Sequence, residues 1–386
     1  MRICILSSFE DSMQRDTGAS VRIYNLSKQL ADLGNHVELI IPKYVESCER
    51  IDGITVRSYK GFLPKTLLKL ISKILGVIRP TTLFFYDPLF ILKASQIIRK
   101  SDVVQFEQQS SGLLLIPIVA KVFRKPVVID CHDTFQALRV KNRNFLRTTF
   151  ETSIEKIIYR FASAILVVSE KEKQFLCSLG MDKDRIQVIP NGVDTKAFSP
   201  SQNAEEIRLR YGLIGHRVVV FVGNMEYTPN QEAVRLIALK IAPEVTKVVK
   251  DAKFLVVGRI AGTTYPNLIF TGTVDSVPPI LAASDVAVAP LFNGSGTRLK
   301  ILEYLSCGLP VVSTKLGSEG LKVKNGVHLI IEDDLDVFTS KLIELLNDKQ
   351  LATQLGKSGR KIAVDEYDWR SIASALNRVF QNLEST

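Results

Sequence analysis

Short apolar runs alternate with amphipathic segments along most of the 386-residue chain. The runs are rich in β-branched residues, which favour strands, and most of them precede a segment with helical periodicity. This alternation predicts an α/β fold in which parallel sheets carry helices on both faces. The expected strands of the first half lie at residues 2–7, 37–41, 103–106, 126–130 and 164–168.

A turn-rich stretch, Ile189-Pro-Asn-Gly-Val-Asp194, interrupts the alternation. A second series of expected strands follows it, at residues 218–223, 254–258, 268–271, 286–290, 311–314 and 328–331. Two such series predict two Rossmann-like domains with a cleft between them. The expected domains are residues 1–190 and 191–366, followed by a terminal helix at 367–386.

The chain is basic, with 50 lysine and arginine residues against 40 aspartate and glutamate residues and a net charge of +10. This charge indicates an anionic partner, such as a phosphorylated substrate, a membrane surface or nucleic acid. No nucleic-acid-binding module accompanies it, so we expect no nucleic-acid partner. The five scattered cysteines are typical of a reduced, cytoplasmic protein. No apolar run is long enough to span a membrane, which predicts a soluble or peripheral protein.

The segment that begins at residue 293 reads Asn-Gly-Ser-Gly-Thr-Arg-Leu-Lys-Ile-Leu-Glu and predicts a glycine loop that opens a short helix. Gly294 and Gly296 allow a ligand to approach the backbone closely. The helix start directs free N–H groups toward that ligand, and Arg298 and Lys300 add cationic donors. Glu303 is placed to accept hydrogen bonds from hydroxyl groups. An anion site beside a carboxylate suits a nucleoside diphosphate, whose ribose hydroxyls need an acceptor.

The same segment resembles the signature of the retaining glycosyltransferases of family 4, also called group 1. Many members have a Glu-x7-Glu motif shortly before a Gly-x-Pro-Val-Val strand. Glu303 matches the second glutamate, whereas Ser295 stands where the first would fall. A subgroup reads Gly-x-Gly-Thr-Arg-Leu-Lys-Ile-Leu-Glu instead, and this chain resembles that subgroup.

Two positions of the first half match the family's pattern. Gly18, in the loop after the first strand, would let a ligand approach a helix N-terminus. The alternative is an ordinary helix start that a serine or threonine caps. His132 follows the strand at residues 127–129, and its counterpart in the family lies near the donor sugar. The alternative is a histidine that is bonded to local backbone groups.

In the second half, Gly223 opens a loop that resembles the family's first strand-to-helix loop near the diphosphate, and Asn224 follows it. Many members carry an arginine and a lysine there, and this loop has neither. We expect Arg298 and Lys300 to supply that charge, the alternative being a pair of exposed helix cations. Arg259 either flanks the nucleotide or is exposed to solvent.

The resemblance thus implies a set of site residues, in which Glu303 would bind the ribose hydroxyls and His132 would position the donor sugar. It implies neither a metal nor another cofactor. The expected catalytic residues are His132, Glu303, Arg298 and Lys300, and the expected donor-binding residues are Gly18, Gly223, Asn224, Gly294, Ser295, Gly296, Thr297 and Arg259.

A second distinctive segment, residues 65–79, lies between two prolines and predicts a basic amphipathic helix. Lys65, Lys69 and Lys73 recur every four residues, and Arg79 ends the segment. Leucines and isoleucines fill the opposite face. Such a helix either lies on an anionic membrane or docks on the first domain with its lysines in solvent.

The resemblance covers nearly the whole chain and implies the GT-B fold. In that fold two Rossmann-like lobes face a central cleft, the first lobe takes the acceptor, and a terminal helix crosses back to it. The implied reaction is the metal-independent, retaining transfer of a sugar from a UDP- or GDP-linked donor to an acceptor glycan or lipid-linked saccharide. This would serve cell-surface glycan or glycolipid synthesis in the cytoplasm, with the protein peripheral on the inner face of the membrane. The alternatives are a sugar-nucleotide epimerase and a non-catalytic, membrane-associated carbohydrate-binding protein.

Overall fold

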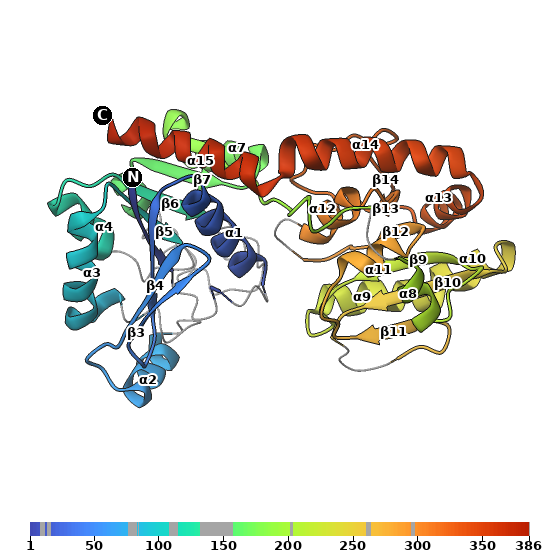
Figure 1. Ribbon diagram of the computed structural model, residues 1–386, viewed down its shortest axis with the longest axis horizontal. Coiled ribbons are helices and arrows are strands. Elements are labelled where there is room, and N and C mark those ends of the chain that lie inside the picture. Colours follow the sequence, from blue (N-terminus) through green and yellow to red (C-terminus); the bar gives the residue numbers. More distant parts are fainter. Residues whose placement is uncertain are drawn as a thin grey trace. The chain divides into compact units, whose positions relative to one another are not determined.

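The computed structural model describes residues 1–7, 12–13, 17–75, 83, 85–107, 115–131, 157–200, 204–259, 264–294 and 298–385. The chain divides into two compact units (Figure 1). The first unit joins Met1–Asn191 to Arg370–Thr386, and the second unit is Gly192–Trp369. The end of the chain therefore belongs with its beginning.

An eight-stranded sheet runs through the first unit in the order β3-β4-β2-β1-β5-β6-β7-β8. Neighbouring strands are parallel except β3 and β4, which form an antiparallel hairpin at one edge. The inner strands β5, β6 and β7 are buried along their whole length, because helices cover both faces of the sheet. The strands are β1 (Arg2–Ser7), β2 (His36–Pro42), β3 (Ser47–Ile51), β4 (Ile54–Tyr59), β5 (Val103–Glu107), β6 (Val127–Cys131), β7 (Ala164–Val167) and β8 (Ile186–Val188).

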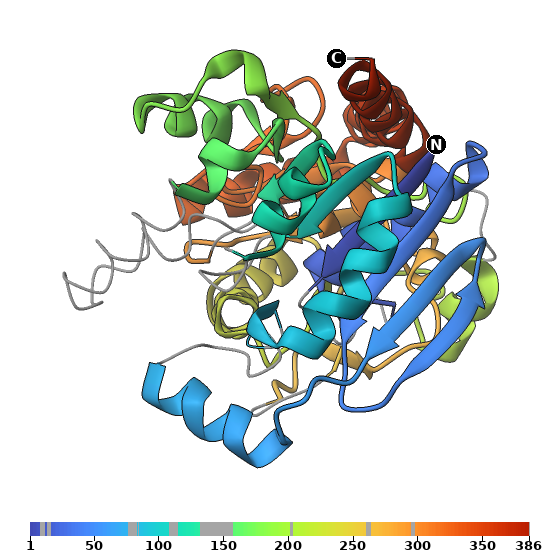
Figure 2. The same ribbon diagram turned by 90° about the vertical axis from the view of Figure 1, so that its left-hand side faces the viewer.

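Helices cover this sheet, and Figure 2 shows α3, in cyan, in front of the strands. Helix α3 begins after Asp87, whose carboxylate accepts the N–H groups of Leu89 and Phe90. The terminal helix is tied to the loop after α1, because Asn35 Nδ2 donates to Asn377 Oδ1 at 3.0 Å. The helices are α1 (Gly18–Asp32), α2 (Lys65–Leu75), α3 (Pro88–Lys100), α4 (Leu115–Val122), α7 (Glu170–Ser178), the short turn η3 (Lys183–Arg185) and α15 (Trp369–Glu384).

A fully parallel, six-stranded sheet in the order β11-β10-β9-β12-β13-β14 forms the centre of the second unit. Its strands are β9 (Arg217–Val222), β10 (Ala252–Val257), β11 (Ile269–Gly272), β12 (Val286–Ala289), β13 (Val311–Ser313) and β14 (Ile330–Ile331). Its helices are α8 (Ala204–Arg210), α9 (Thr228–Leu236), the π-helical turn η4 (Ile237–Ile241), α10 (Ala242–Val248), α11 (Pro278–Ala282), α12 (Leu299–Ser306), α13 (Leu335–Asn347) and α14 (Lys349–Tyr367). The two sheets confirm the predicted α/β class.

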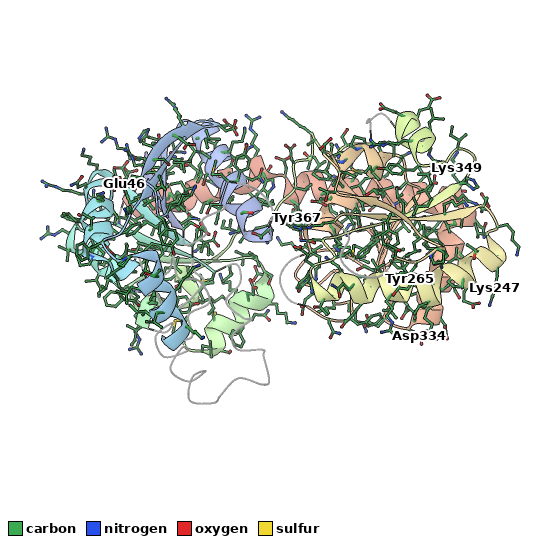
Figure 3. The ribbon with its side chains drawn as sticks, turned by 90° about the horizontal axis from the view of Figure 1, so that it is seen from below. Glu46, Lys247, Tyr265, Asp334, Lys349 and Tyr367 are labelled. Carbon is green, nitrogen blue, oxygen red and sulfur yellow. The ribbon has the colours of Figure 1, made fainter. Side chains whose placement is uncertain are left out.

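Helix α14 packs closely on the end of α12 because a glycine lies at the contact. An added Cβ at Gly356 would lie 2.1 Å from the carbonyl oxygen of Gly308. Tyr367, labelled in Figure 3, ends α14 and is buried. Its hydroxyl accepts the Lys322 N–H at 2.6 Å, and its carbonyl accepts the Val193 N–H at 2.8 Å. The contact at Gly356 holds α14 against the end of α12, the helix that carries Lys300 and directly follows Arg298.

Candidate functional site

The two expected loops of the second unit lie where the strand order of its sheet reverses. From β9 the chain proceeds to β10 and β11 on one side, and then returns to β12 on the other side of β9. Ligands of open parallel sheets bind outside the carboxyl ends of the strands at such a reversal. The segment after β9 begins with Gly223, and the segment after β12 leads to Gly294. Topology alone therefore selects both loops.

The loop after β9 is held against the end of β10. The N–H of Gly223 donates to the Val257 carbonyl at 2.9 Å, and that of Met225 donates to the Arg259 carbonyl at 3.1 Å. Gly258 has a φ of +131°, and an added Cβ there would lie only 2.1 Å from the carbonyl oxygen of Gly223. Position 258 therefore requires glycine, although no pattern in the sequence indicated it.

The substitution Gly258→Ala is expected to lower the free energy of unfolding by on the order of 1–3 kcal/mol, because it adds a clash to an unfavourable φ. The matched control is Gly212→Ala. Gly212 also has a positive φ, +64°, but an added Cβ there meets nothing within 4 Å. Denaturant unfolding of both variants measures the difference, and equal losses would contradict the importance of the contact with Gly223.

Asn230 fills the space beside Gly223. An added Cβ at Gly223 would lie 2.8 Å from the Cγ and Nδ2 atoms of Asn230, which is 7% exposed. Asn230 Nδ2 donates to the Asn224 carbonyl at 2.8 Å. Asn224 is itself exposed, and its Oδ1 accepts the Glu226 N–H at 3.0 Å. The missing side chain of Gly223 thus admits Asn230, and the loop presents Asn224 to solvent.

Arg259 follows Gly258 at the end of β10 and is exposed. Its Nη1 lies 3.2 Å from Glu226 Oε1, and the two side chains are 67% and 51% exposed. Such a surface ion pair contributes little to stability. Arg259 therefore lies beside the loop after β9 and is paired at the surface with Glu226.

Arg298 packs against the backbone of Gly294. An added Cβ at Gly294, whose φ is +108°, would lie 2.9 Å from Arg298 Nη2 and 2.6 Å from the Tyr227 hydroxyl. The same Cβ would lie 3.1 Å from Pro229 in the first turn of α9. Arg298 is only 8% exposed, so it is not an exposed helix cation. The structure thus brings the guanidinium to the junction of the two loops.

Lys300 and Glu303 lie one turn apart on α12 and are both partly buried. Lys300 Nζ donates to Asn230 Oδ1 at 2.8 Å and lies 4.1 Å from the centre of the Phe221 ring. The pKa of Lys300 is lowered to about 7, mainly by burial and also by the nearby Arg298, while Glu303 opposes the shift. Burial also raises the pKa of Glu303 to about 7, against the effect of Lys300. Both groups therefore change charge near neutral pH.

The pH dependence of stability follows from the lowered pKa of Lys300. The unfolded chain holds this proton up to about pH 10.5, whereas the folded protein loses it above about 7, so its contribution to stability rises with pH across that window. Lys300→Met removes this slope. The variant's stability relative to wild type is expected to fall between pH 7 and 10, by about 1.36 kcal/mol for each unit of pKa shift. Denaturant unfolding across this range measures it, and a constant difference would contradict the lowered pKa.

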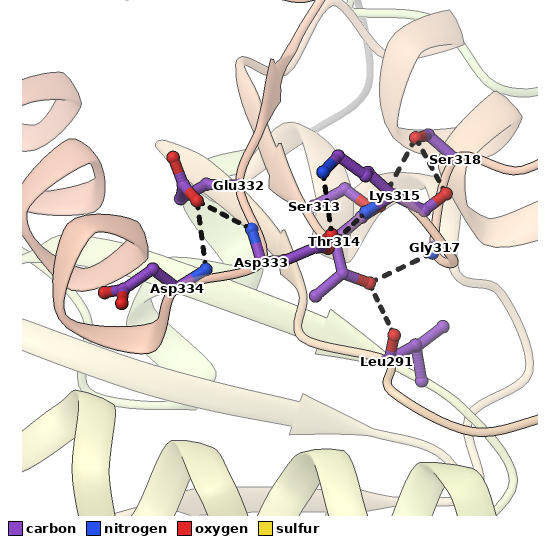
Figure 4. Close-up of polar contacts among 9 residues, drawn as sticks. All are labelled: Leu291, Ser313, Thr314, Lys315, Gly317, Ser318, Glu332, Asp333 and Asp334. Carbon is purple, nitrogen blue, oxygen red and sulfur yellow. Dashed lines mark hydrogen bonds and ion pairs between the residues drawn. The ribbon is translucent and has the colours of Figure 1, made fainter.

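Thr314 joins the ends of β12 and β13 (Figure 4). It is fully buried directly after β13. Its Oγ1 donates to the Leu291 carbonyl at 2.5 Å and accepts the Gly317 N–H at 3.0 Å. Leu291 follows β12 and begins the segment that leads to Gly294. The sequence predicted a strand that ends at Thr314, but not this tie to the loop.

In the first unit, Gly18 is the exposed first residue of α1. Thr17 and Ser20 form a reciprocal cap: the Thr17 Oγ1 accepts the Ser20 N–H at 3.2 Å, and the Ser20 Oγ accepts the Thr17 N–H at 3.0 Å. The local structure is therefore that of a threonine-capped helix start. A ligand at Gly18 stays a prediction.

A buried ion pair in the first unit had not been predicted. Arg22 on α1 is fully buried. Its Nε and Nη2 donate to the two carboxylate oxygens of Asp130 at 2.8 and 3.1 Å. Its Nη1 donates to the Pro190 carbonyl at 3.0 Å and to Asn191 Oδ1 at 3.1 Å. Asp130 lies near the end of β6, so the pair fixes the end of the strand that precedes position 132.

Helix α2 docks on the first unit through Leu68, which is fully buried. Leu67 and Leu70 on the same helix are 38% and 55% exposed. Lys69 and Lys73 are also exposed. The helix therefore has a docked face and a solvent face on which lysines and leucines lie together. Among the described helices, none is long and apolar enough to cross a membrane.

Several expected positions lie outside the described residues, and their roles stay predictions. They are His132, Ser295, Gly296, Thr297 and Arg79. The side chain of Lys65 lies outside them as well.

Family models match both halves of the chain. The model of Glycosyltransferase Family 4 matches residues 17–197, and that of Glycosyl transferases group 1 matches residues 216–348. These ranges contain Gly18 and His132 in the first half, and the loops at Gly223 and Gly294 in the second. The protein belongs to the family 4 glycosyltransferases.

Several characterised proteins and solved structures are similar to the chain, among them the following three. The GDP-mannose-dependent alpha-(1-6)-phosphatidylinositol monomannoside mannosyltransferase of Mycolicibacterium smegmatis is 25% identical over 323 residues, which cover 77% of this chain and 81% of that protein. The UDP-Gal:alpha-D-GlcNAc-diphosphoundecaprenol alpha-1,3-galactosyltransferase of Escherichia coli is 26% identical over 268 residues, covering 65% and 68%. The structure of Anabaena HepE in complex with UDP matches with a TM-score of 0.73 at 18% identity, covering 99% and 100%. The fold is GT-B, and the protein is a glycosyltransferase.

Proposed function

We propose that the protein transfers a sugar from a nucleoside diphosphate donor to a hydroxyl group of a glycan or lipid-linked saccharide, with retention of configuration. The bond from the sugar C1 to the diphosphate breaks, a bond from C1 to the acceptor oxygen forms, and the acceptor proton leaves with the diphosphate or to solvent. The observation that carries the proposal is Arg298, buried against Gly294 at the reversal of the second sheet. The relatives support the donor class, since one is named for GDP-mannose and another for UDP-Gal.

In this proposal, negative charge grows on the departing diphosphate, and preorganised donors stabilise it. Arg298 and Lys300 are two cations, two residues apart at the start of α12, that supply such donors. They provide the positive charge that a metal ion would otherwise bring, which is why we propose a metal-independent reaction. The Glu303 carboxylate would accept hydrogen bonds from the ribose hydroxyl groups, and His132 would position the donor sugar.

The donor is identified by thermal unfolding of the protein with a panel of UDP- and GDP-linked sugars. A true donor is expected to raise the midpoint, because a ligand that binds only the folded state stabilises it. Incubation of that donor with and without acceptors then separates transfer from epimerisation, which needs no acceptor. Neither the epimerase nor the non-catalytic alternative is favoured, because both named relatives are transferases. A protein that no nucleotide sugar stabilises would contradict the proposal.

We further propose that the solvent face of α2 lies on an anionic membrane on the cytoplasmic side, where a lipid-linked acceptor would be found. Exposed Leu67 and Leu70 would enter the interface beside Lys69 and Lys73. Phe62, which is 78% exposed just before the helix, would add apolar contact.

Flotation with anionic vesicles tests this surface. The double variant Lys69→Glu/Lys73→Glu is expected to lower vesicle binding at least about tenfold, since each lysine near an anionic surface contributes about 1 kcal/mol. The control is Lys240→Glu/Lys250→Glu, which changes the charge equally on exposed lysines of the second unit. Equal effects of the two double variants would exclude a specific role for α2.

A further inference from the structure

Asn230 makes three contacts that join separate parts of the second-unit site. Its Oδ1 accepts a hydrogen bond from Lys300 Nζ at 2.8 Å, and its Nδ2 donates to the Asn224 carbonyl at 2.8 Å. Its N–H donates to the Tyr227 carbonyl at 2.9 Å. The residue is 7% exposed, and its side chain occupies the space left by Gly223. One amide thus holds the loop after β9 and the ammonium group of α12 together.

We infer that Asn230 is a positioning residue for donor binding, which holds the Lys300 ammonium group in place to contact the diphosphate. The inference rests on the function proposed above and deepens it. Asn230 would act only through Lys300 and Asn224, without touching the donor itself. It would thereby link the two loops that follow β9 and β12.

The chemistry of the amide suits this task. A partly buried ammonium group needs an acceptor, because a missing hydrogen bond to a charged group is costly. A carboxylate at position 230 would supply one, but its charge would offset the positive charge that the diphosphate requires. The amide oxygen accepts a hydrogen bond without neutralising Lys300, and the Phe221 ring, whose centre lies 4.1 Å from the Nζ atom, adds attraction without any charge.

Among the described residues, the charged groups that act on Lys300 are Glu303 on the same helix and Arg298, which directly precedes that helix. The groups that meet it from β9 and α9, the Phe221 ring and the Asn230 amide, are neutral. Because the pKa of Lys300 is lowered to about 7, binding of an anionic diphosphate is expected to draw a proton onto Lys300 above that pH. Donor affinity would therefore fall as the pH rises above about 7.

The test is isothermal titration calorimetry of the whole protein with UDP and with GDP, between pH 5.5 and 9. The variants are Asn230→Leu, Asn230→Asp and Lys300→Met. The control is Asn267→Leu, because Asn267 Nδ2 also donates to a backbone carbonyl, that of Ala238 at 2.8 Å, and within the described part of the chain it forms no hydrogen bond with a lysine. Thermal unfolding of each variant verifies that it is folded.

The substitution Asn230→Leu is expected to weaken binding of the preferred nucleotide by roughly 10- to 100-fold at pH 6.5, the range for a hydrogen bond to a charged group. In Asn230→Leu the loss of affinity at high pH should begin at a lower pH than in the wild type. In Asn230→Asp it should begin at a higher pH. Lys300→Met should abolish that part of the pH dependence, and adding Asn230→Leu to Lys300→Met should leave the pH profile unchanged.

The outcomes separate the inference from the proposed function. If the wild type binds UDP or GDP, and Asn230→Leu matches Asn267→Leu in affinity and pH profile, the inference is wrong while the proposed function stands. If Asn230→Leu does not fold, an unshifted pH profile for Asn230→Asp would overturn the inference. If the wild type binds neither nucleotide at any pH, the proposed function fails and the inference with it.

Discussion

Replacing Arg298 with alanine is expected to lower kcat/KM for sugar transfer by roughly 10²- to 10³-fold, the usual effect of removing one preorganised donor to a developing charge. Most of the loss should be in kcat, because the charge on the diphosphate is greatest in the transition state. Arg298→Lys should recover part of the rate, since it keeps the charge but loses the planar guanidinium. Steady-state kinetics, with the donor found in the thermal screen, measures kcat and KM for the wild type, Arg298→Ala and Arg298→Lys.

The control for Arg298 is Arg235→Ala, an exposed arginine in the last turn of α9. Its kcat/KM should stay within about twofold of wild type, because its charge is screened by solvent. Since Arg298 is buried, thermal unfolding must show that Arg298→Ala remains folded at the assay temperature. A folded Arg298→Ala variant with wild-type kinetics would remove this residue from the site.

The second large effect concerns the stability of the first unit. Arg22→Met is expected to lower its free energy of unfolding by about 3–5 kcal/mol, because it leaves the buried Asp130 carboxylate without its cation. The double variant Arg22→Met/Asp130→Leu should recover much of the loss, since it removes both buried charges. Denaturant unfolding measures each variant.

The matched control for Arg22 is Arg57→Met. Arg57 pairs with Glu38 through Nε and Oε2 at 2.6 Å in the same unit, but its side chain is 31% exposed. A partly solvated pair of this kind should cost only about 0–1 kcal/mol. Similar losses of unfolding free energy for Arg22→Met and Arg57→Met would show that the buried ion pair contributes no more to stability than the partly exposed one.

The alternation of apolar runs predicted the inner strands of both sheets because these strands are buried on both faces. It did not predict the β3–β4 hairpin, whose first strand is mostly exposed and polar. A turn signal was nevertheless present. Asp52-Gly53 has positive φ values of 47° and 82°, and Asp-Gly is a preferred pair in two-residue hairpins.

The sequence predicts only the part of the site whose residues lie within one short segment. Arg298, Lys300 and Glu303 were grouped because they lie on one turn and a half of sequence. The contact between Lys300 and Asn230 joins positions 70 residues apart, and no local pattern marks it.

The partners of the Arg22–Asp130 pair are 108 residues apart, but the sequence around each of them indicates that it is buried. Arg22 lies among the buried positions of α1, next to Ile23 and one turn from Leu26. Asp130 lies within an otherwise apolar strand. A charge of each sign in two apolar patterns is a signal for a buried pair, because buried charges are almost always paired.

The central claim, that the reversal of the second sheet holds the donor nucleotide, is tested most directly by hydrogen–deuterium exchange with saturating UDP or GDP. We expect slower exchange in peptides that contain residues 223–227 and 298–303, because a ligand that binds there suppresses local opening. Peptides of α13 (Leu335–Asn347) should be unchanged. Nucleotide binding that protects other segments and leaves both site peptides unaltered would contradict the account.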